Sequence, residues 1–172
     1  MSCSIPTTTQ ECGVADQLCI ERSVWLDLMT ELRRRGAGVH ESGAFLLGRI
    51  HAGRRDVESI VFYDDLDPNA YATGVCVLYA DAFDRLWEMC RQRGLDVVAD
   101  IHTHLGASFQ SDADRTNPMV AMPGHVALIV ERFARDPVWR HRLGVYRYEG
   151  AHRWTGFDGM KARAMIKSGT IA

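Results

Sequence analysis

Apolar positions recur at intervals of three and four residues in two stretches of the chain, which is the spacing of one helix face. Ser23 is expected to cap the first helix, which ends at Gly36 and Gly38. Asp81 is expected to cap the second, which ends before Gly94. The apolar positions are Trp25, Leu28, Met29 and Leu32 in the first helix and Phe83, Leu86, Trp87 and Cys90 in the second. The pattern therefore predicts two helices that each cover a core with one face.

Short runs of apolar and β-branched residues predict strands between and after these helices. The clearest are residues 44–50, a continuous apolar run, and residues 95–101, which lead directly into His102. Further strands are expected at 57–63, 75–78, 126–130, 144–148 and 153–155, with a turn at 64–69 and short helices from Ser111 to Pro118 and over 160–165. Because helices and strands alternate without a strict βαβ rhythm, we expect an α/β fold of the α+β kind, with a mixed central sheet flanked by helices.

The length and composition are typical of a single globular domain. The chain has 172 residues, of which 47% are hydrophobic and 24% charged, so it can bury a core without disulfides. We expect a polar N-terminal arm over 1–16, one domain over 17–160 and a C-terminal tail over 161–172.

Charge and cysteine content argue against several classes of partner. The formal net charge of −2 gives no electrostatic reason to expect nucleic acid. The five cysteines are irregularly spaced and form no CxxC pair, so they predict neither a disulfide framework nor a cysteine zinc site. The N-terminus lacks the pattern of a secretory signal, and no stretch has the ~18 consecutive apolar residues of a membrane span. We therefore expect a cytoplasmic protein that binds neither membranes nor nucleic acid.

The segment after the strand at 95–101 carries the most specific chemistry. A spacing of two places the imidazoles of His102 and His104 on one face of that strand's end. Asp114 comes from a different element, in the first turn of the helix expected from Ser111. Two imidazoles and a carboxylate are the protein ligands of a catalytic zinc site, in which water takes the fourth position. His102, His104 and Asp114 are therefore the candidate metal ligands.

Other interpretations of these residues stay open at this stage. Ser111-x-x-Asp114 also has the form of an N-terminal capping box, and Asp112 is a neighbouring carboxylate. Two histidines and one carboxylate can also hold iron as a facial triad. The chain has no HExxH, no HxE with PCxxC and no GxSxG, which argues against thermolysin-like enzymes, zinc deaminases and esterases of that type.

The combination of Glu41, His102-Thr103-His104 and Ser111-x-x-Asp114 resembles the JAMM motif of the JAB/MPN metalloproteases. The resemblance covers about residues 20–155, and residues 111–125 are similar to bacterial members in particular. It implies a single JAB/MPN domain of cytidine-deaminase-like architecture that binds Zn²⁺.

The resemblance also assigns roles to the site residues. His102, His104 and Asp114 would hold zinc, which lowers the pKa of a bound water toward ~7. Glu41 would accept the water's proton and return it to the leaving amine. Ser111 would donate a hydrogen bond to the tetrahedral oxyanion.

Two features depart from the family pattern. Leu105 stands where members usually have proline, and the segment between His104 and Ser111 is one residue shorter than in the common eukaryotic form. Neither change removes a ligand, but both affect the loop beside the metal. His40 and His125 also lie near the motif and are interpreted as structural or surface residues.

For the substrate, the resemblance implies cleavage after the C-terminal glycine of a ubiquitin-like protein, by deconjugation or by precursor processing. The setting would be a bacterial conjugation or antiviral defence system, with activating and conjugating enzymes as further partners. The alternatives are a protease that processes a ubiquitin-fold sulfur carrier and an MPN-type scaffold without catalysis. Residues 64–67 and 69–77 could line a groove to which an extended tail adds as a strand, or could be an ordinary surface connection.

Overall fold

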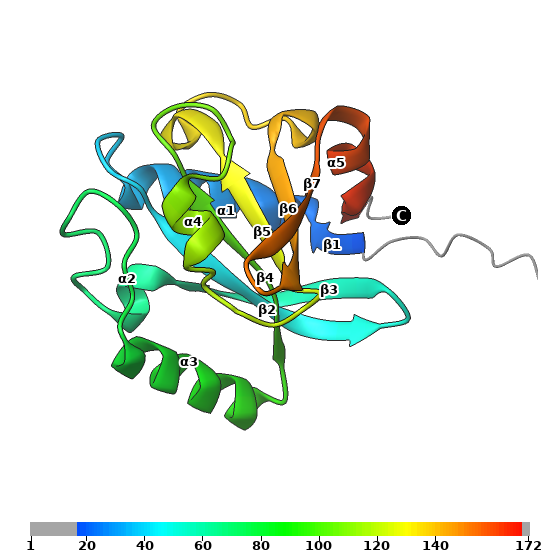
Figure 1. Ribbon diagram of the computed structural model, residues 1–172, viewed down its shortest axis with the longest axis horizontal. Coiled ribbons are helices and arrows are strands. Elements are labelled where there is room, and N and C mark those ends of the chain that lie inside the picture. The colour runs from blue at the N-terminus through cyan, green and yellow to red at the C-terminus, as the bar shows by residue number, and fades with distance from the viewer. Residues whose placement is uncertain (1–16, 170–172) are drawn as a thin grey trace, which may run out of the picture.

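The computed structural model describes residues 17–169, which form one sheet with helices on both faces (Figure 1). The strands are β1 (Gln17–Glu21), β2 (Gly43–His51), β3 (Arg54–Phe62), β4 (Asp96–Thr103), β5 (Val126–Val130), β6 (Gly144–Gly150), β7 (Arg153–Phe157) and β8 (Ile166–Gly169). The helices are α1 (Arg22–Arg35), α2 (Tyr63–Leu66), α3 (Ala80–Arg93), α4 (Asp112–Thr116) and α5 (Gly159–Met165), with short turns η1 (Glu131–Ala134) and η2 (Arg140–Arg142). The arm expected over residues 1–16 lies outside the described residues.

The sheet mixes parallel and antiparallel pairs. Across residues 17–169 its strands lie in the order β7-β6-β5-β4-β2-β3-β1-β8. The central strand β2 is antiparallel to β3 and β4, whereas β4 is parallel to β5. This arrangement confirms the predicted α+β fold with a mixed sheet flanked by helices.

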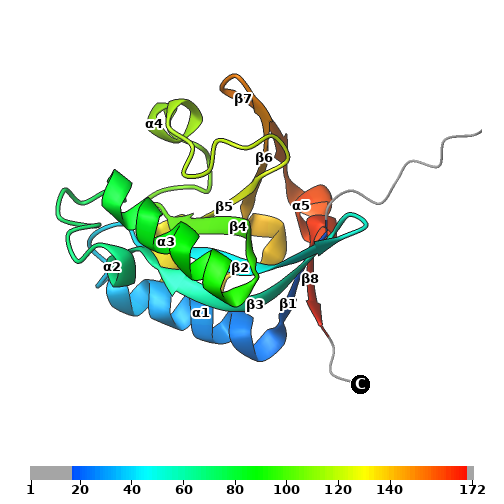
Figure 2. The same cartoon turned by 90° about the horizontal axis from the view of Figure 1, so that it is seen from below.

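The core has two parts, one on each face of the sheet, and both are anchored by β2. Ala44 and Leu46 belong to the cluster that includes the apolar face of α1. Phe45 and Leu47 belong to the cluster that includes Leu86 of α3. Successive side chains of a strand point to opposite faces, so the continuous apolar run at 44–50 follows from burial on both sides. Figure 2 shows the sheet between these two helices.

The first long helix begins earlier than its pattern predicts. Glu21 occupies the N-cap position of α1, so Ser23 is not the cap and lies inside the helix. The hydroxyl of Ser23 donates a hydrogen bond to the Glu21 carboxylate at 2.7 Å. Strand β1, which the sequence pattern missed, runs directly into α1 and leaves no loop in which a capping residue could stand.

Helix α3 agrees with its predicted extent but not with its predicted cap. Tyr79 occupies the N-cap position and Asp81 lies within the first turn, while Gly94 ends the helix in the left-handed conformation. The side chain of Trp87 is 41% exposed, so Leu86 contributes more to the buried face. Among residues 17–169, no helix combines the length and apolar character needed to cross a bilayer.

Two segments before α3 differ from their prediction. Residues 63–66 form the helix α2 where a turn was expected from 64 on. Residues 75–78 are not a strand, since they form no ladder with the sheet. The backbone N–H of Val77 instead donates to the carbonyl of Ala70 at 2.9 Å. Residues 75–78 are apolar because they form a wall beside the sheet. Sequence periodicity does not distinguish such a segment from a strand.

The sheet continues beyond the boundary expected at residue 160. Helix α5 confirms the short helix expected at 160–165, and β8 then pairs in parallel with β1. The expected tail over 161–172 therefore differs from the structure up to Gly169, and residues 170–172 lie outside the described part. Four residues of β8 are too few to show a period in sequence, so only the pairing reveals the strand.

The loop between His104 and Ser111 packs against the start of β6. The hydroxyl of Tyr146 donates to the carbonyl of Ser108 at 3.0 Å and accepts from the N–H of Gln110 at 3.3 Å. Gly144 makes this contact possible, because a Cβ there would lie 1.9 Å from the Ser108 carbonyl oxygen. The conformation of this loop thus depends on the absence of a side chain at residue 144.

We expect Gly144→Ala to lower the free energy of unfolding by about 1–3 kcal/mol, as overpacked sites do, because the loop must move to admit the methyl group. Gly156→Ala is the matched control, since its Cβ would come no closer than 3.4 Å to the Tyr146 ring. Its effect should stay within about 0.5 kcal/mol. Urea denaturation of both variants measures the difference, and equal stabilities would contradict the close approach.

Candidate metal centre

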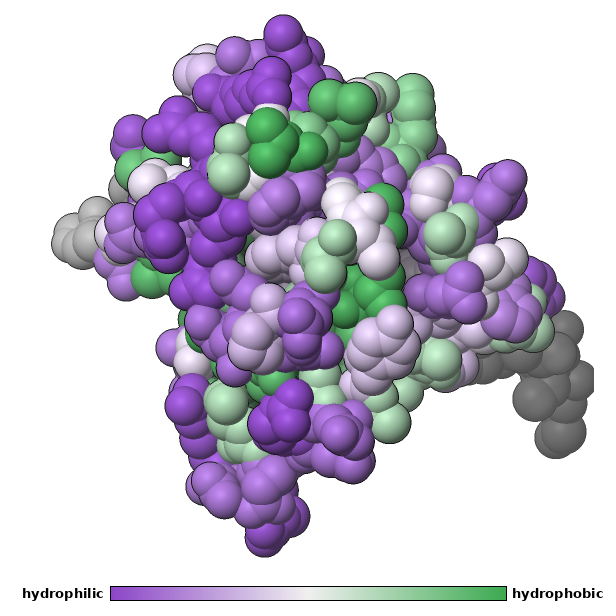
Figure 3. Space-filling view, turned by 90° about the vertical axis from the view of Figure 1, so that its left-hand side faces the viewer, coloured by the Kyte–Doolittle hydropathy of each residue, from purple (hydrophilic) through white to green (hydrophobic). Residues whose placement is uncertain are grey.

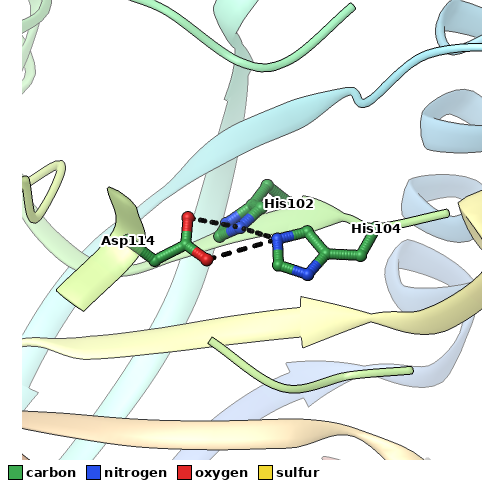
Figure 4. Close-up of side chains that lie close together, drawn as sticks. All are labelled: His102, His104 and Asp114. Atoms are coloured by element: carbon green, nitrogen blue, oxygen red, sulfur yellow. Dashed lines mark hydrogen bonds and ion pairs between the residues drawn. The ribbon is translucent and has the colours of Figure 1, made fainter. Parts of the chain in front are cut away.

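Three polar side chains converge where β4 ends and α4 begins. His102 lies on β4, His104 follows it and Asp114 comes from α4 (Figure 4). The Nε2 atoms of the two histidines are 2.9 Å apart. Asp114 places Oδ1 3.3 Å from Nε2 of His102 and Oδ2 3.3 Å from Nε2 of His104. The structure therefore brings the three predicted ligand residues together.

The arrangement fits a tetrahedrally bound metal ion. One ligand atom from each side chain lies within 4.8 Å of the other two. Ligand atoms at about 2.0–2.2 Å from a tetrahedral zinc ion are about 3.3 Å apart, close to the distances between these atoms. The donors are two imidazoles and a carboxylate, which is the ligand set of catalytic rather than of structural zinc sites. Asp112 is exposed and does not belong to the group, so the structure favours Asp114 between the two carboxylates.

Glu41 lies beside this group, at the end of β2. In the β2–β4 ladder Gly43 pairs with His102, and the same register continued by two residues sets Glu41 opposite His104. Oε1 of Glu41 lies 3.8 Å from Nε2 of His104. Oε2 accepts a hydrogen bond from the backbone N–H of Cys76 at 3.2 Å. One carboxylate oxygen is thus anchored, and the other faces the candidate metal ligands.

Ser111 forms a capping box with Asp114. Its hydroxyl accepts from the N–H of Asp114 at 3.1 Å, and Oδ2 of Asp114 accepts from the Ser111 N–H at 2.6 Å and from its hydroxyl at 2.8 Å. The capping-box interpretation is therefore correct, and it coexists with ligand geometry. Because Oδ2 is held by Ser111, Asp114 presents a fixed carboxylate to both histidines.

Opposite charges at the site shift the pKa values of its histidine and aspartate side chains. Burial by itself would lower the pKa of His102, but the hydrogen bond and negative charge of Asp114 raise it above its ordinary value. Burial would raise the pKa of Asp114, yet hydrogen bonds with His102 and His104 hold it well below the usual range. Burial, with Glu41 and Asp114 nearby, raises the pKa of the Cys76 thiol. The site therefore has an excess of negative charge that favours a cation, and its thiol stays protonated.

The other sequence candidates lie around the group. The ring of His40 stacks on Tyr71 with centroids 5.4 Å apart and takes no part in the cluster. Leu105 is 69% exposed and begins the loop beside the site. His125 is buried and donates from Nε2 to Oδ1 of Asp100 at 2.6 Å, in agreement with its structural interpretation. Asp100 was not singled out from the sequence, because a single acidic residue inside an apolar strand carries no spacing signal.

A groove with a volume of about 660 Å³ adjoins the carboxylates. The segment 75–78 forms one wall, and Ala113, Asn117 and Met119 line the other. Helix α4 and the segment before α3, which carry these lining residues, lie toward the left of Figure 1. Figure 3 shows that face, where apolar residues gather near the centre among hydrophilic ones. The site is therefore continuous with this groove, since Glu41, Ser111 and Asp114 line both.

Comparison with known proteins finds a relative over part of the chain. A protein of Sinorhizobium fredii named as a probable metalloprotease is 33% identical over 94 residues, which cover 54% of this chain and 58% of that protein. The chain thus spans somewhat over half the length of this relative. Over that stretch it is similar to a metalloprotease. No model of a known protein family matches the sequence.

One solved structure shares the fold at low sequence identity, and a second aligns more weakly. A solution structure of a Desulfitobacterium hafniense protein aligns with a TM-score of 0.60 and 15% identity, covering 89% of this chain and 94% of that one. A Salinibacter ruber protein aligns with a TM-score of 0.48 and 20% identity, covering 77% and 86%. The first likeness concerns the fold alone.

We expect His104→Ala to abolish stoichiometric binding of Zn²⁺, because two remaining side chains leave the ion without its third protein ligand. Isothermal titration at neutral pH measures the loss. His40→Ala is the control, since His40 neighbours Glu41 in sequence but faces Tyr71, and it should bind zinc as the wild type does. Unchanged binding by His104→Ala would remove His104 from the ligand set.

Proposed function

We propose that the protein is a zinc-dependent peptidase or isopeptidase whose zinc ion is held by His102, His104 and Asp114. The observation that carries the proposal is the position of Glu41, with Oε1 3.8 Å from Nε2 of His104. A carboxylate at the edge of a ligand triad, and outside it, can act as a base toward water bound there. A bound zinc ion supplies Lewis acidity, which lets a water molecule lose its proton near neutral pH.

Two side chains of the protein supply the proton transfer and the stabilisation of the oxyanion. Glu41 accepts the proton on its free oxygen and delivers it to the leaving amine, while its hydrogen bond from Cys76 fixes the carboxylate. Ser111 stands at the start of α4, where its hydroxyl can turn from Asp114 toward the oxyanion of the tetrahedral intermediate. Each group has one backbone contact, from the Cys76 N–H to Glu41 and from the Asp114 N–H to the Ser111 hydroxyl.

The groove beside Glu41 suits an extended peptide. Within the described chain, segment 75–78 pairs with no strand, although its Cys76 and Val77 N–H groups already donate to Glu41 and Ala70. A substrate that adds as a short strand would pair with the remaining backbone groups. We propose that the substrate is the C-terminal tail of a ubiquitin-like protein, cleaved after its terminal glycine in deconjugation or precursor processing. The resemblance of the motif to bacterial JAMM proteases supports this, and with it a role in a conjugation or antiviral defence system with cognate activating and conjugating enzymes.

Three alternative functions involve the same residues. Processing of a ubiquitin-fold sulfur carrier would use the same groove and the same chemistry. A non-catalytic scaffold has no need for three ligands and an anchored base, so the presence of Glu41 with the triad favours catalysis. A facial-triad iron enzyme shares the ligands, whereas similarity to a metalloprotease favours hydrolysis.

We expect Glu41→Gln to reduce hydrolysis by at least about 10²–10⁴-fold, because the amide cannot accept the proton, while zinc content stays at one ion per chain. The assay follows cleavage of a ubiquitin-like protein, encoded beside this gene, fused through its C-terminal glycine to a reporter peptide. Asp112→Asn is the control, since it neutralises an exposed carboxylate on the same helix as Asp114. Turnover by Glu41→Gln at the wild-type rate would eliminate Glu41 as the base.

We expect Ala113→Trp to block the groove and to lower kcat/KM for the fusion by about 10²-fold through misplacement of the scissile bond. Zinc affinity should not change, because Ala113 lines the groove and contributes no ligand atom. Ala113→Ser is the matched control that preserves the space. If the tryptophan variant cleaves the fusion as fast as the serine variant, the tail binds elsewhere.

A further inference from the structure

A chain of buried polar groups lies behind the metal ligands, on the face of the sheet that α3 covers. Asp100 is 2% exposed, and its carboxylate accepts two hydrogen bonds. Nε2 of His125 donates to Oδ1 at 2.6 Å, and the hydroxyl of Tyr63 donates to Oδ2 at 3.3 Å. Burial, together with the charge of Asp100, raises the pKa of Tyr63, so its hydroxyl remains a donor. Three elements thus hold one carboxylate inside an otherwise apolar layer.

Asp100 and His102 lie two residues apart on β4, so their side chains point to the same face. Nε2 of His102 faces His104 and Asp114, which leaves Nδ1 on the inner side of the ring. Nδ1 is fully buried and has no hydrogen-bond partner among residues 17–169. Oδ2 of Asp100 lies 4.0 Å from it. A slight turn of the imidazole or of the carboxylate would close this distance to a hydrogen bond.

The chemistry of a histidine ligand explains why this neighbour matters. When Nε2 gives its lone pair to a metal ion, the neutral ring carries its proton on Nδ1. A buried N–H without an acceptor is unfavourable, so a ligand histidine ordinarily donates its second N–H to a carboxylate or carbonyl. At this site the carboxylate of Asp100 stands on the side of the ring where the proton must lie.

We propose that Asp100 is a positioning residue for His102: it accepts the Nδ1–H of the metal-bound imidazole and thereby fixes its tautomer and orientation. Tyr63 and His125 in turn fix Asp100, so the buried chain reaches from the start of α2 and from the residue before β5 to the site. The proposal rests on the metal site of the proposed function and adds to it a residue that touches neither metal nor substrate.

The test compares zinc affinity in variants of the whole chain. Asp100→Asn keeps the shape and can still accept from His125, but its amide N–H₂ then faces Nδ1–H of His102 and cannot accept. The Kd for Zn²⁺, measured by competition with a chromogenic chelator, should rise about 10–100-fold. Tyr63→Phe is the matched control, because it removes a hydrogen bond to the same oxygen and leaves the carboxylate in place. Its Kd should rise less than about threefold, and an equal loss in both variants would overturn the proposal.

A second measurement needs no variant. In zinc-loaded wild-type protein labelled with ¹⁵N, the imidazole of His102 should show a protonated Nδ1 whose hydrogen exchanges slowly with water. A His102 bound through Nδ1, or an Nδ1 hydrogen in fast exchange with water, would also overturn the proposal. If the wild type binds no zinc, the proposed function itself fails. If the wild type binds zinc and Asp100→Asn binds it equally well, only the role of Asp100 fails.

Discussion

The antiparallel pairing of β2 with β4 is the constraint on which the site depends. In this ladder Gly43 lies opposite His102, and the same register sets Glu41 opposite His104. A slip of one residue would turn both histidines toward α1 and would separate them from Glu41. Gly43 secures the register, since a Cβ there would come within 2.2 Å of the Tyr63 ring and 2.9 Å of the Ile101 carbonyl oxygen. The pairing of β2 with β4 therefore sets the distance between Glu41 and the two histidines.

Asp114, the third candidate ligand, does not lie on the β2–β4 ladder. Its position depends on the loop after His104. The backbone of His104 is held on both sides, since its N–H donates to Val130 and its carbonyl accepts from Phe133, each at 2.9 Å. Phe133 and its neighbours in η1 have positive φ, which for residues with side chains is a strained conformation. The loop then passes over Gly144 to the capping box that orients Asp114. The candidate metal site thus joins the end of β4 to a loop that is fixed by several separate contacts.

Charge links the shape of the site to its chemistry. The carboxylates of Glu41, Asp100 and Asp114 surround two imidazoles, so a divalent cation would balance a local excess of negative charge. Each carboxylate has a separate anchor: a backbone N–H for Glu41, Tyr63 and His125 for Asp100, and Ser111 for Asp114. Since no two share an anchor, one can accept a proton while another holds a ligand. This separation is compatible with the peptidase function proposed above.

The sequence by itself indicated the strongly periodic elements and grouped His102, His104 and Asp114 as candidate ligands. The runs at 44–50 and 95–101 lie in strands whose central residues are buried on both faces. The spacing of the three polar residues predicts a metal ligand set, and the structure brings them together. The tertiary structure decided what depends on distant partners. Strands β1 and β8 are recognisable only through their pairing, of β1 with β3 and of β8 with β1. Residues 75–78 form a groove wall because they join no strand of the sheet. Asp100 acquires its significance in the same way, since its neighbours Tyr63 and His125 come from segments far away in sequence.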